Sequence, residues 1–417
     1  MTHSPSAHPL DHHFRRNVVG ISLVEFLWGL GMPPVFESTF LQLFLRHLGA
    51  SSLLIGLIPT LAAAGTALSG LLSYSLTGHL ERKRTAVILV HVITALPMLV
   101  FGLILGFTGF GSATLGLFLA LYAFFSMTVG LILPVWQNYL MKIFSEKRAV
   151  PAMAVMMTAQ SVAKLVGSLF LVRVVERYSF SASGASLIFT LVGAVFLIGS
   201  FPFLFTVEEA GLGARSAAVG RGHKPSLAEL FRNRAFLVFL GTDLEYFALS
   251  GVIAFYANYA TEFCGIDPAL ASGLFMAFTY VGGVLANGLL GWANLFSLRT
   301  KYLVTKALAT AGLVLMAFHS PAWVFYLASL LFGASRGTRL MVFAPSVKRL
   351  SDHADATLYF AVAPVLALPF STGLPLLNGA FLDRFASLGA VSYRIVFLAM
   401  AVLSLGGLFF AARMRKE

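Results

Sequence analysis

Apolar runs of membrane-spanning length alternate with short polar segments along the whole chain. About 20 apolar residues suffice for a helix to cross a bilayer. Helices are predicted because open strands would leave backbone groups unpaired in lipid, and the period-2 alternation of a barrel is missing. The runs that predict twelve transmembrane helices cover about residues 17–44, 51–76, 85–108, 114–136, 151–174, 183–206, 235–261, 269–293, 301–318, 322–344, 359–381 and 393–412.

The longest polar stretch, residues 207–234, divides these runs into two groups of six. The prediction is an all-α membrane protein with twelve transmembrane helices in two pseudo-symmetric six-helix bundles. Its predicted parts are a cytoplasmic tail (residues 1–16), an N-terminal half (17–206), a cytoplasmic linker (207–234), a C-terminal half (235–412) and a second cytoplasmic tail (413–417).

A weak internal repeat supports the two halves. Arg16 enters helix 1 with Glu25 nine residues later, and Arg234 enters helix 7 with Asp243 nine residues later. Gly-Leu-Leu recurs before the basic loops that follow helices 2 and 8, at the same offset of about 218 residues. Internal repeats of this kind are typical of secondary transporters.

Composition supports a membrane protein and removes other classes. Hydrophobic residues make up 58% of the 417 residues and charged residues 11%, whereas soluble domains have roughly 25% charged residues. The net charge of +12 would suggest nucleic acid in a soluble protein, but the basic residues lie in gaps between apolar runs. Cys264 is the single cysteine, which excludes an intrachain disulfide.

Basic residues predict the orientation. With a cytoplasmic N-terminus, the inside segments hold 20 Lys and Arg residues and the outside segments hold five. Lys and Arg concentrate on the cytoplasmic side of membrane proteins. We therefore predict a multi-pass protein of the cell inner membrane with both termini in the cytoplasm.

Motifs of enzymes and pumps are missing from the sequence. It has no Gly-x-x-x-x-Gly-Lys-Ser/Thr phosphate-binding loop, no His-Glu-x-x-His zinc helix and no Gly-x-Ser-x-Gly elbow. The chain is therefore predicted not to be an enzyme, and to use no cofactor and no metal.

The segments after helices 2 and 4 resemble a known family. Gly78-His79-Leu80-Glu81-Arg82-Lys83-Arg84 and Ser145-Glu146-Lys147-Arg148 are similar to the Gly-x-Leu-Ala-Asp-Arg-x-Gly-Arg-Arg and Pro-x-Glu-x-Arg-Gly segments of the major facilitator superfamily. With the two six-helix halves, the resemblance covers about residues 14–412. It implies that helices 1, 4, 7 and 10 line a central cavity, that helices 2, 5, 8 and 11 flank it, and that helices 3, 6, 9 and 12 face lipid.

Carboxylates inside the predicted helices are candidates for coupling, since an ionisable group in the membrane costs several kcal/mol and marks function. Glu25 lies in helix 1, and Asp243 and Glu245 lie in helix 7. A carboxyl group in a partly dry cavity can load and release a proton near neutral pH. Asp243 and Glu245 are two residues apart, so we expect only one of them to face the cavity. The alternative role for each is an ion pair at a gate.

Cations inside helices are candidates for binding an anion. Lys164 lies near the bilayer middle of helix 5, and Arg336 and Arg339 share one face of helix 10. We predict that Arg336 faces the cavity and pairs with Asp243 or Glu245, because an unpaired guanidinium there would be too costly.

The remaining candidates are polar residues of the cavity and of the gates. Pro33 and Pro34 must kink or break helix 1, which makes the nearby Glu37 a candidate for gating. The loop cations Arg82, Lys83 and Arg84 are predicted to bias the conformational equilibrium rather than bind substrate. The polar residues predicted to contact substrate in helices 7 and 11 are Tyr256, Asn258 and Asn378.

These observations predict a secondary active transporter that moves a small, anionic or amphipathic organic solute by alternating access, coupled to protons as a symporter or antiporter. Its partners are then a small-molecule substrate, membrane lipid and protons, with no nucleic acid, and the protein is a monomer. Two alternatives stay open from the sequence. One is a lipid or lysolipid translocase, and the other is a non-transporting receptor or assembly factor built on a transporter fold.

Overall fold

The computed structural model describes residues 12–36, 38–77, 83–208, 227–292, 296–351 and 357–413. These residues form helices and no strand. Ten helices among them are long and apolar enough to cross a membrane. The two other predicted segments are also helical: the first is divided into three parts, and the tenth carries Arg336 and Arg339. The described helices therefore account for all twelve predicted segments.

The first half contains six segments, and its first segment is broken where the prolines predicted it. The regular helical hydrogen bonding is interrupted at Met32, directly before Pro33, although Met32 keeps helical dihedral angles (φ −66°, ψ −40°). The cause is that proline lacks the N–H that a helix interior needs. The elements of this half are α1 (Phe14–Gly31), α2 (Pro33–Phe36), α3 (Ser38–His47), α4 (Ser52–Thr77), α5 (Lys83–Thr108), α6 (Thr114–Ile143), α7 (Glu146–Tyr178), α8 (Ala182–Ile198) and η2 (Phe201–Phe205).

The second half repeats this arrangement with a differently broken first segment. Helix 7 is divided at Asn233, at Asp243 and at Ala254–Phe255, although residues 234–263 include no proline. The elements are α10 (Leu227–Arg232), α11 (Arg234–Thr242), α12 (Leu244–Ile253), α13 (Tyr256–Phe263), α14 (Pro268–Ala286), the π-helical η3 (Asn287–Trp292), α15 (Leu298–Phe318), α16 (Ala322–Ser351), α17 (Thr357–Arg384), η4 (Ala386–Leu388) and α18 (Ala390–Ala412).

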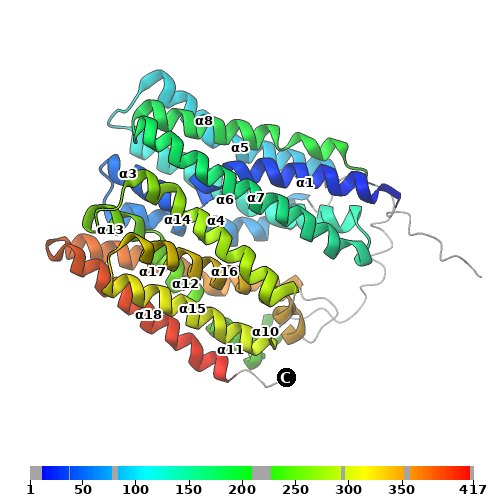
Figure 1. The fold of residues 1–417 in the computed structure, drawn as a ribbon. Coiled ribbons are helices and arrows are strands. Elements are labelled where there is room, and N and C mark those ends of the chain that lie inside the picture. The colour runs from blue at the N-terminus through cyan, green and yellow to red at the C-terminus, as the bar shows by residue number, and fades with distance from the viewer. Residues whose placement is uncertain are drawn as a thin grey trace, which may run out of the picture.

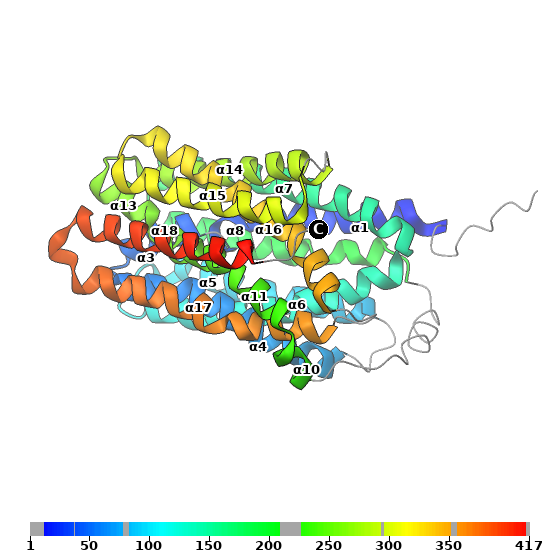
Figure 2. The same cartoon turned by 90° about the horizontal axis from the view of Figure 1, so that it is seen from below.

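The two halves lie side by side as bundles of nearly antiparallel helices (Figure 1). Helix α1 begins, and α18 ends, at the end of the molecule where residues 208 and 227 flank the linker (Figures 1 and 2). We name this the linker end, and the other the opposite end. Several helices extend past the predicted apolar runs, such as α6 to Ile143 and α7 from Glu146, because helical hydrogen bonding continues into the polar interface after the hydrocarbon ends.

Two seams join the halves: α4 packs on α17, and α7 packs on α14. Glycine permits the close approach at both. A Cβ atom at Gly56 would collide with the carbonyl of Pro375, and one at Gly273 with the carbonyl of Ser168. Small residues at such crossings allow two backbones to pack closely in a membrane. The halves therefore meet through close backbone contact at both seams.

Candidate functional site

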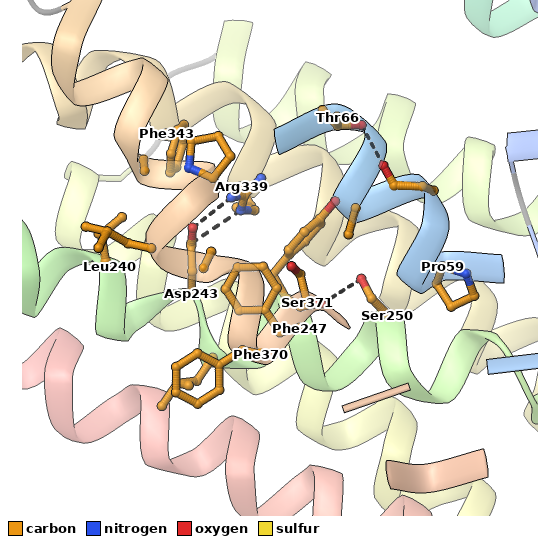
Figure 3. A pocket seen from close by; sticks show the side chains of 18 of the residues that line it. Pro59, Thr66, Leu240, Asp243, Phe247, Ser250, Arg339, Phe343, Phe370 and Ser371 are labelled. Carbon is orange, nitrogen blue, oxygen red and sulfur yellow. Dashed lines mark hydrogen bonds and ion pairs between the residues drawn. The ribbon is translucent and has the colours of Figure 1, made fainter. Parts of the chain in front are cut away.

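A cavity of about 710 Å³ lies between the two halves. Its walls extend from the middle of α4 to Leu237 and Phe410, close to the linker end. Figure 3 shows the wall formed by α4, α12, α16 and α17. Most lining side chains are apolar or aromatic, and the polar and charged ones are Thr66, Asp243, Tyr246, Ser250, Arg336, Arg339, Ser371 and Tyr122. A few polar groups in an apolar cleft are typical of a small-molecule site.

An ion pair between α11–α12 and α16 lies in the cavity wall (Figure 3). The Arg339 guanidinium donates two hydrogen bonds to the Asp243 carboxylate, with Nη2 2.7 Å from Oδ2 and Nε 3.3 Å from Oδ1. The guanidinium also lies over two rings, 4.0 Å from the centroid of Tyr246 and 4.6 Å from that of Phe343. A forked pair with aromatic stacking holds arginine in a defined orientation.

The Asp243 side chain reaches the cavity because helix 7 is interrupted there. Asp243 has φ −78° and ψ 1° and stands between α11 and α12. Its backbone N–H bonds to the carbonyl of Leu240 in a tight turn. Asp243 lines the cavity, whereas Glu245 is absent from the lining residues and is 1% exposed. Of the two carboxylates, only Asp243 lines the cavity, in agreement with the expectation that one of them would face it.

The Glu245 carboxylate forms a second ion pair inside the C-terminal half. Its Oε2 lies 3.1 Å from Nζ of Lys306 on α15, and the Ser335 hydroxyl of α16 donates to its Oε1 over 3.5 Å. The Lys306 side chain is 0% exposed. The sequence patterns did not single out Lys306 as a candidate, although it lies inside predicted helix 9. The signal was nevertheless present, since a lysine within an apolar helix needs a partner.

The cations that pair with these carboxylates differ from the prediction, which named Arg336. Asp243 pairs with Arg339 and Glu245 pairs with Lys306. Helix α16 runs toward the linker end, so Arg339 lies one turn nearer that end than Arg336 and at the level of Asp243. Arg336 does line the cavity. The sequence placed both arginines on one face, but the register of α16 against helix 7 is a tertiary property.

Glu25 belongs to a cluster in the N-terminal half. Its Oε2 accepts a hydrogen bond of 2.5 Å from Nε2 of Gln160 on α7, and Lys164 is near enough to attract it. Nζ of Lys164 lies 5.6 Å from the ring centroid of Tyr280 on α14, across the α7–α14 seam. Neither Glu25 nor Lys164 is among the residues that line the cavity. Their coupling or substrate role therefore stays a prediction.

Three other predicted contacts are buried in the C-terminal half. The Tyr256 hydroxyl lies 3.2 Å from the Ser329 hydroxyl, and Asn378 donates to the carbonyl of Gly251 over 3.2 Å. Asn258 is 0% exposed. These residues are absent from the lining of the cavity in this conformation.

Lys83 and Arg84 are anchored at the linker end. Their backbone N–H groups, which begin α5, each donate to a carboxylate oxygen of Glu208 over 2.9 Å. A carboxylate at a helix N-terminus satisfies otherwise unpaired donors. Nη1 of Arg84 donates to the carbonyl of Thr206. The gating role of these cations is untested, and the other two predicted gating residues, Arg82 and Glu37, lie outside the described residues.

Polar contacts between the halves gather toward the opposite end. Nε of Arg46 lies 2.7 Å from Oε1 of Glu262. Asp383, at the end of α17, accepts hydrogen bonds of 2.7 and 2.8 Å from the backbone N–H groups of Ser52 and Leu53 at the start of α4. The cavity lies on the linker side of these contacts.

The family model for the Major Facilitator Superfamily matches residues 35–338, which is more than half of the chain. The chain belongs to the Major Facilitator Superfamily. Members of this superfamily with solved structures share its fold over nearly the whole length. A mutant form of the nucleoside transporter NupG matches at 12% identity and TM-score 0.72, over 96% of this chain and 100% of that chain.

Two further superfamily structures match similarly. A mutant form of the peptide transporter POT in complex with sulfate matches at 15% identity and TM-score 0.67, over 99% of this chain and 96% of that chain. A bacterial homologue of the human lysosomal transporter Spinster, inward-facing and unoccupied, matches at 15% identity and TM-score 0.65, over 98% and 96%. A comparison with curated protein sequences gives no match. These likenesses show the superfamily fold over nearly the whole chain, and they leave the substrate open.

Proposed function

We propose that this superfamily member is a secondary active transporter that moves a small, amphipathic organic anion across the inner membrane by alternating access, coupled to protons. The observation that carries the proposal is the Asp243–Arg339 pair in the wall of a cavity between two halves. Among the described lining residues, the forked guanidinium of Arg339 is a group that can bond to the negative group of a ligand. The aromatic and apolar walls favour an apolar body.

The proposed coupling uses Arg339 as a shared cation. In the empty protein, Arg339 bonds to the Asp243 carboxylate in a forked ion pair. A substrate anion that competes for Arg339 releases Asp243, which can then take a proton. Arginine stays protonated throughout, so the carboxylate must be the group that titrates. Binding of the substrate to Arg339 and protonation of Asp243 therefore accompany each other, and this links the flux of substrate to the flux of protons.

The orientation is part of the proposal. The basic-residue bias supports a cytoplasmic linker end. The present conformation then has its cavity toward the cytoplasm and its polar cross-half contacts at the extracytoplasmic end. Intact cells treated with an impermeant thiol reagent should label Cys264, which follows α13 at the opposite end. Labelling that occurs only after lysis would contradict this orientation.

A reconstitution experiment tests the transport itself. Purified protein in vesicles with an imposed pH gradient should accumulate an amphipathic carboxylate or phosphate, chosen by a thermal-shift screen because a ligand stabilises the state that it binds. The matched control is Asp243→Asn. A wild-type protein that binds the same anion but never moves it would indicate the non-transporting receptor instead.

A lipid or lysolipid translocase is the second candidate. The observation in its favour is the mostly apolar lining of the cavity, with Phe247, Phe343 and Phe370 beside the charged pair. A lysophospholipid also has one anionic phosphate. Short-chain and long-chain anions with the same head group separate the two functions, since a translocase prefers the long chain and a solute carrier prefers the short one.

A further inference from the structure

The break between α12 and α13 leaves two backbone groups turned away from their helical partners. In a continuous helix, the N–H of Ala257 would donate to the carbonyl of Ile253. Here Phe255 has φ −130°, and its N–H bonds back to Val252 over 2.8 Å. A buried backbone group without a partner is costly. The break therefore needs partners from elsewhere in the fold.

A single side chain of the other half supplies both partners. Nε2 of Gln42, on α3, donates to the carbonyl of Ile253 over 2.9 Å, and its Oε1 accepts from the N–H of Ala257 over 3.0 Å. Gln42 is 1% exposed. Its carboxamide thus occupies the position that one helical hydrogen bond would fill. Because α3 and α13 belong to different halves, this contact must be lost when the halves separate at the opposite end.

Asn258, the residue after Ala257 in α13, has the opposite effect on the closed state. Asn258 is 0% exposed, and within the described residues neither its Oδ1 nor its Nδ2 has a hydrogen-bond partner. A carboxamide buried in this way destabilises the state that buries it. Separation of the halves would let water reach it. Gln42 therefore stabilises the closed state of the opposite end, and the buried Asn258 carboxamide destabilises it. Both effects act within one turn of helix 7.

We propose that Gln42 and Asn258 are opposed gating residues that set how often the opposite end opens. Gln42 holds the end closed by completing the broken helix. Asn258 favours opening because its carboxamide is satisfied only when hydrated. On opening, Ala257 N–H and Ile253 C=O can pair with each other, so that α12 and α13 join into one helix. This inference rests on the proposed alternating-access function and adds the residues that bias its equilibrium.

The single cysteine provides the readout. Cys264 follows α13 at the opposite end and is partly buried, so the rate of its alkylation by N-ethylmaleimide follows the opening of that end. The full chain is measured in vesicles. Gln42→Met keeps the length but removes both hydrogen-bonding groups, and alkylation should become about tenfold faster. Asn258→Leu removes the unpaired carboxamide, and alkylation should become several-fold slower.

Two variants serve as matched controls. Thr39→Val removes a hydrogen bond of 3.1 Å to the carbonyl of Ser272, which also crosses between the halves but involves no helix break, so the rate should stay within about twofold. Asn378→Leu removes the side-chain N–H group that donates a hydrogen bond to the carbonyl of Gly251 in the same region. Asn378 and Gly251 belong to one half and stay together on opening, so this variant should lower the melting temperature without a comparable change in alkylation.

Several outcomes would overturn the inference. They are a change in the same direction for Gln42→Met and Asn258→Leu, an effect of Thr39→Val as large as that of Gln42→Met, or no change for either gating variant. If Gln42→Met does not fold, Gln42→Glu keeps the acceptor for Ala257 N–H and loses the donor, and faster alkylation is again expected. If the two gating variants change the alkylation rate of Cys264 in opposite directions but the protein transports nothing, the proposed function is overturned and the gating roles of Gln42 and Asn258 are supported. If the protein transports normally and neither variant changes the alkylation rate, the gating roles are overturned and the proposed function is supported.

Discussion

Helix 1 and helix 7 hold equivalent positions in the two halves, and both are broken, but for different reasons. The break in helix 1 is local, since Pro33 and Pro34 cannot continue a helix. The breaks in helix 7 contain no proline, and the one at Ala254–Phe255 is held by the side chain of Gln42 from the other half. The first half is therefore bent by its own sequence, whereas the bends of the second half depend on tertiary contacts.

The acidic residues of the two helices differ in the same way. Glu25 bonds to the neutral side chain of Gln160, with Lys164 near enough to attract it, whereas Asp243 and Glu245 have Arg339 and Lys306 as ion-pair partners. Around Glu25 the N-terminal half has a core of packed aromatic rings, with Trp28 stacked on Phe196 at 4.3 Å. Equivalent positions of the two helices have thus taken different chemistry.

The largest effect is expected where the buried Glu245–Lys306 ion pair of the second half is disrupted. Lys306→Met leaves the Glu245 carboxylate without its cation in a site that is 1% exposed, so the free energy of unfolding should fall by about 3–5 kcal/mol. Gln160→Leu, the counterpart in the first half, removes one hydrogen bond to Glu25 and should cost about 1–3 kcal/mol. Denaturation in detergent measures both.

A rescue variant shows whether charge causes the loss. Adding Glu245→Gln to Lys306→Met removes the orphaned carboxylate and should restore most of the stability. Equal losses for Lys306→Met and Gln160→Leu, or no rescue, would mean that the two halves do not differ in the way described.

The second prediction concerns coupling. Asp243→Asn keeps the shape of the side chain but cannot release and take a proton, so accumulation driven by a pH gradient should fall at least about tenfold while substrate exchange across the membrane continues. Glu25→Gln, at the equivalent position of helix 1, should keep most accumulation. Vesicle uptake and counterflow assays measure the two properties. Normal accumulation by Asp243→Asn with loss in Glu25→Gln would move the coupling site to the first half.

The third prediction concerns the shape of the cation. Arg339→Lys keeps the charge but loses the fork that bonds to Asp243 and the planar contact with Tyr246, so substrate affinity should fall by about tenfold. Arg336→Lys leaves the Asp243 pair intact and should change affinity less. Competition binding measures both constants, and a larger effect at Arg336 would identify that residue as the principal anion contact.

The smallest expected effect is a shift in a titration at the end of helix 7. Burial raises the pKa of the Cys264 thiol. The thiolate is the reactive form, so alkylation near pH 7 should be slower than for an exposed cysteine, and its pH midpoint should lie above that of an exposed cysteine. Gln42→Met should lower the midpoint, because an open end hydrates the thiol. An ordinary midpoint in the wild type, unchanged in the variant, would show that Cys264 is exposed in both.

The sequence alone determined the class of fold and much of the candidate site. The length of the apolar runs predicted twelve helices, because a bilayer sets that length, and Pro33-Pro34 predicted the break in helix 1. The cost of charge in lipid identified Asp243, Glu245 and Arg339 as candidates. These conclusions depend on local composition and spacing, which a single chain displays directly.

Only the tertiary structure decided which charges meet and where helix 7 breaks. Asp243 pairs with Arg339, and Glu245 pairs with Lys306, because the register of α16 and α15 against helix 7 follows from packing across the bundle. The α12–α13 break depends on Gln42, which lies 211 residues from Ile253. Helix propensity says nothing of such a contact, since the carboxamide replaces a backbone hydrogen bond only after the two halves have come together.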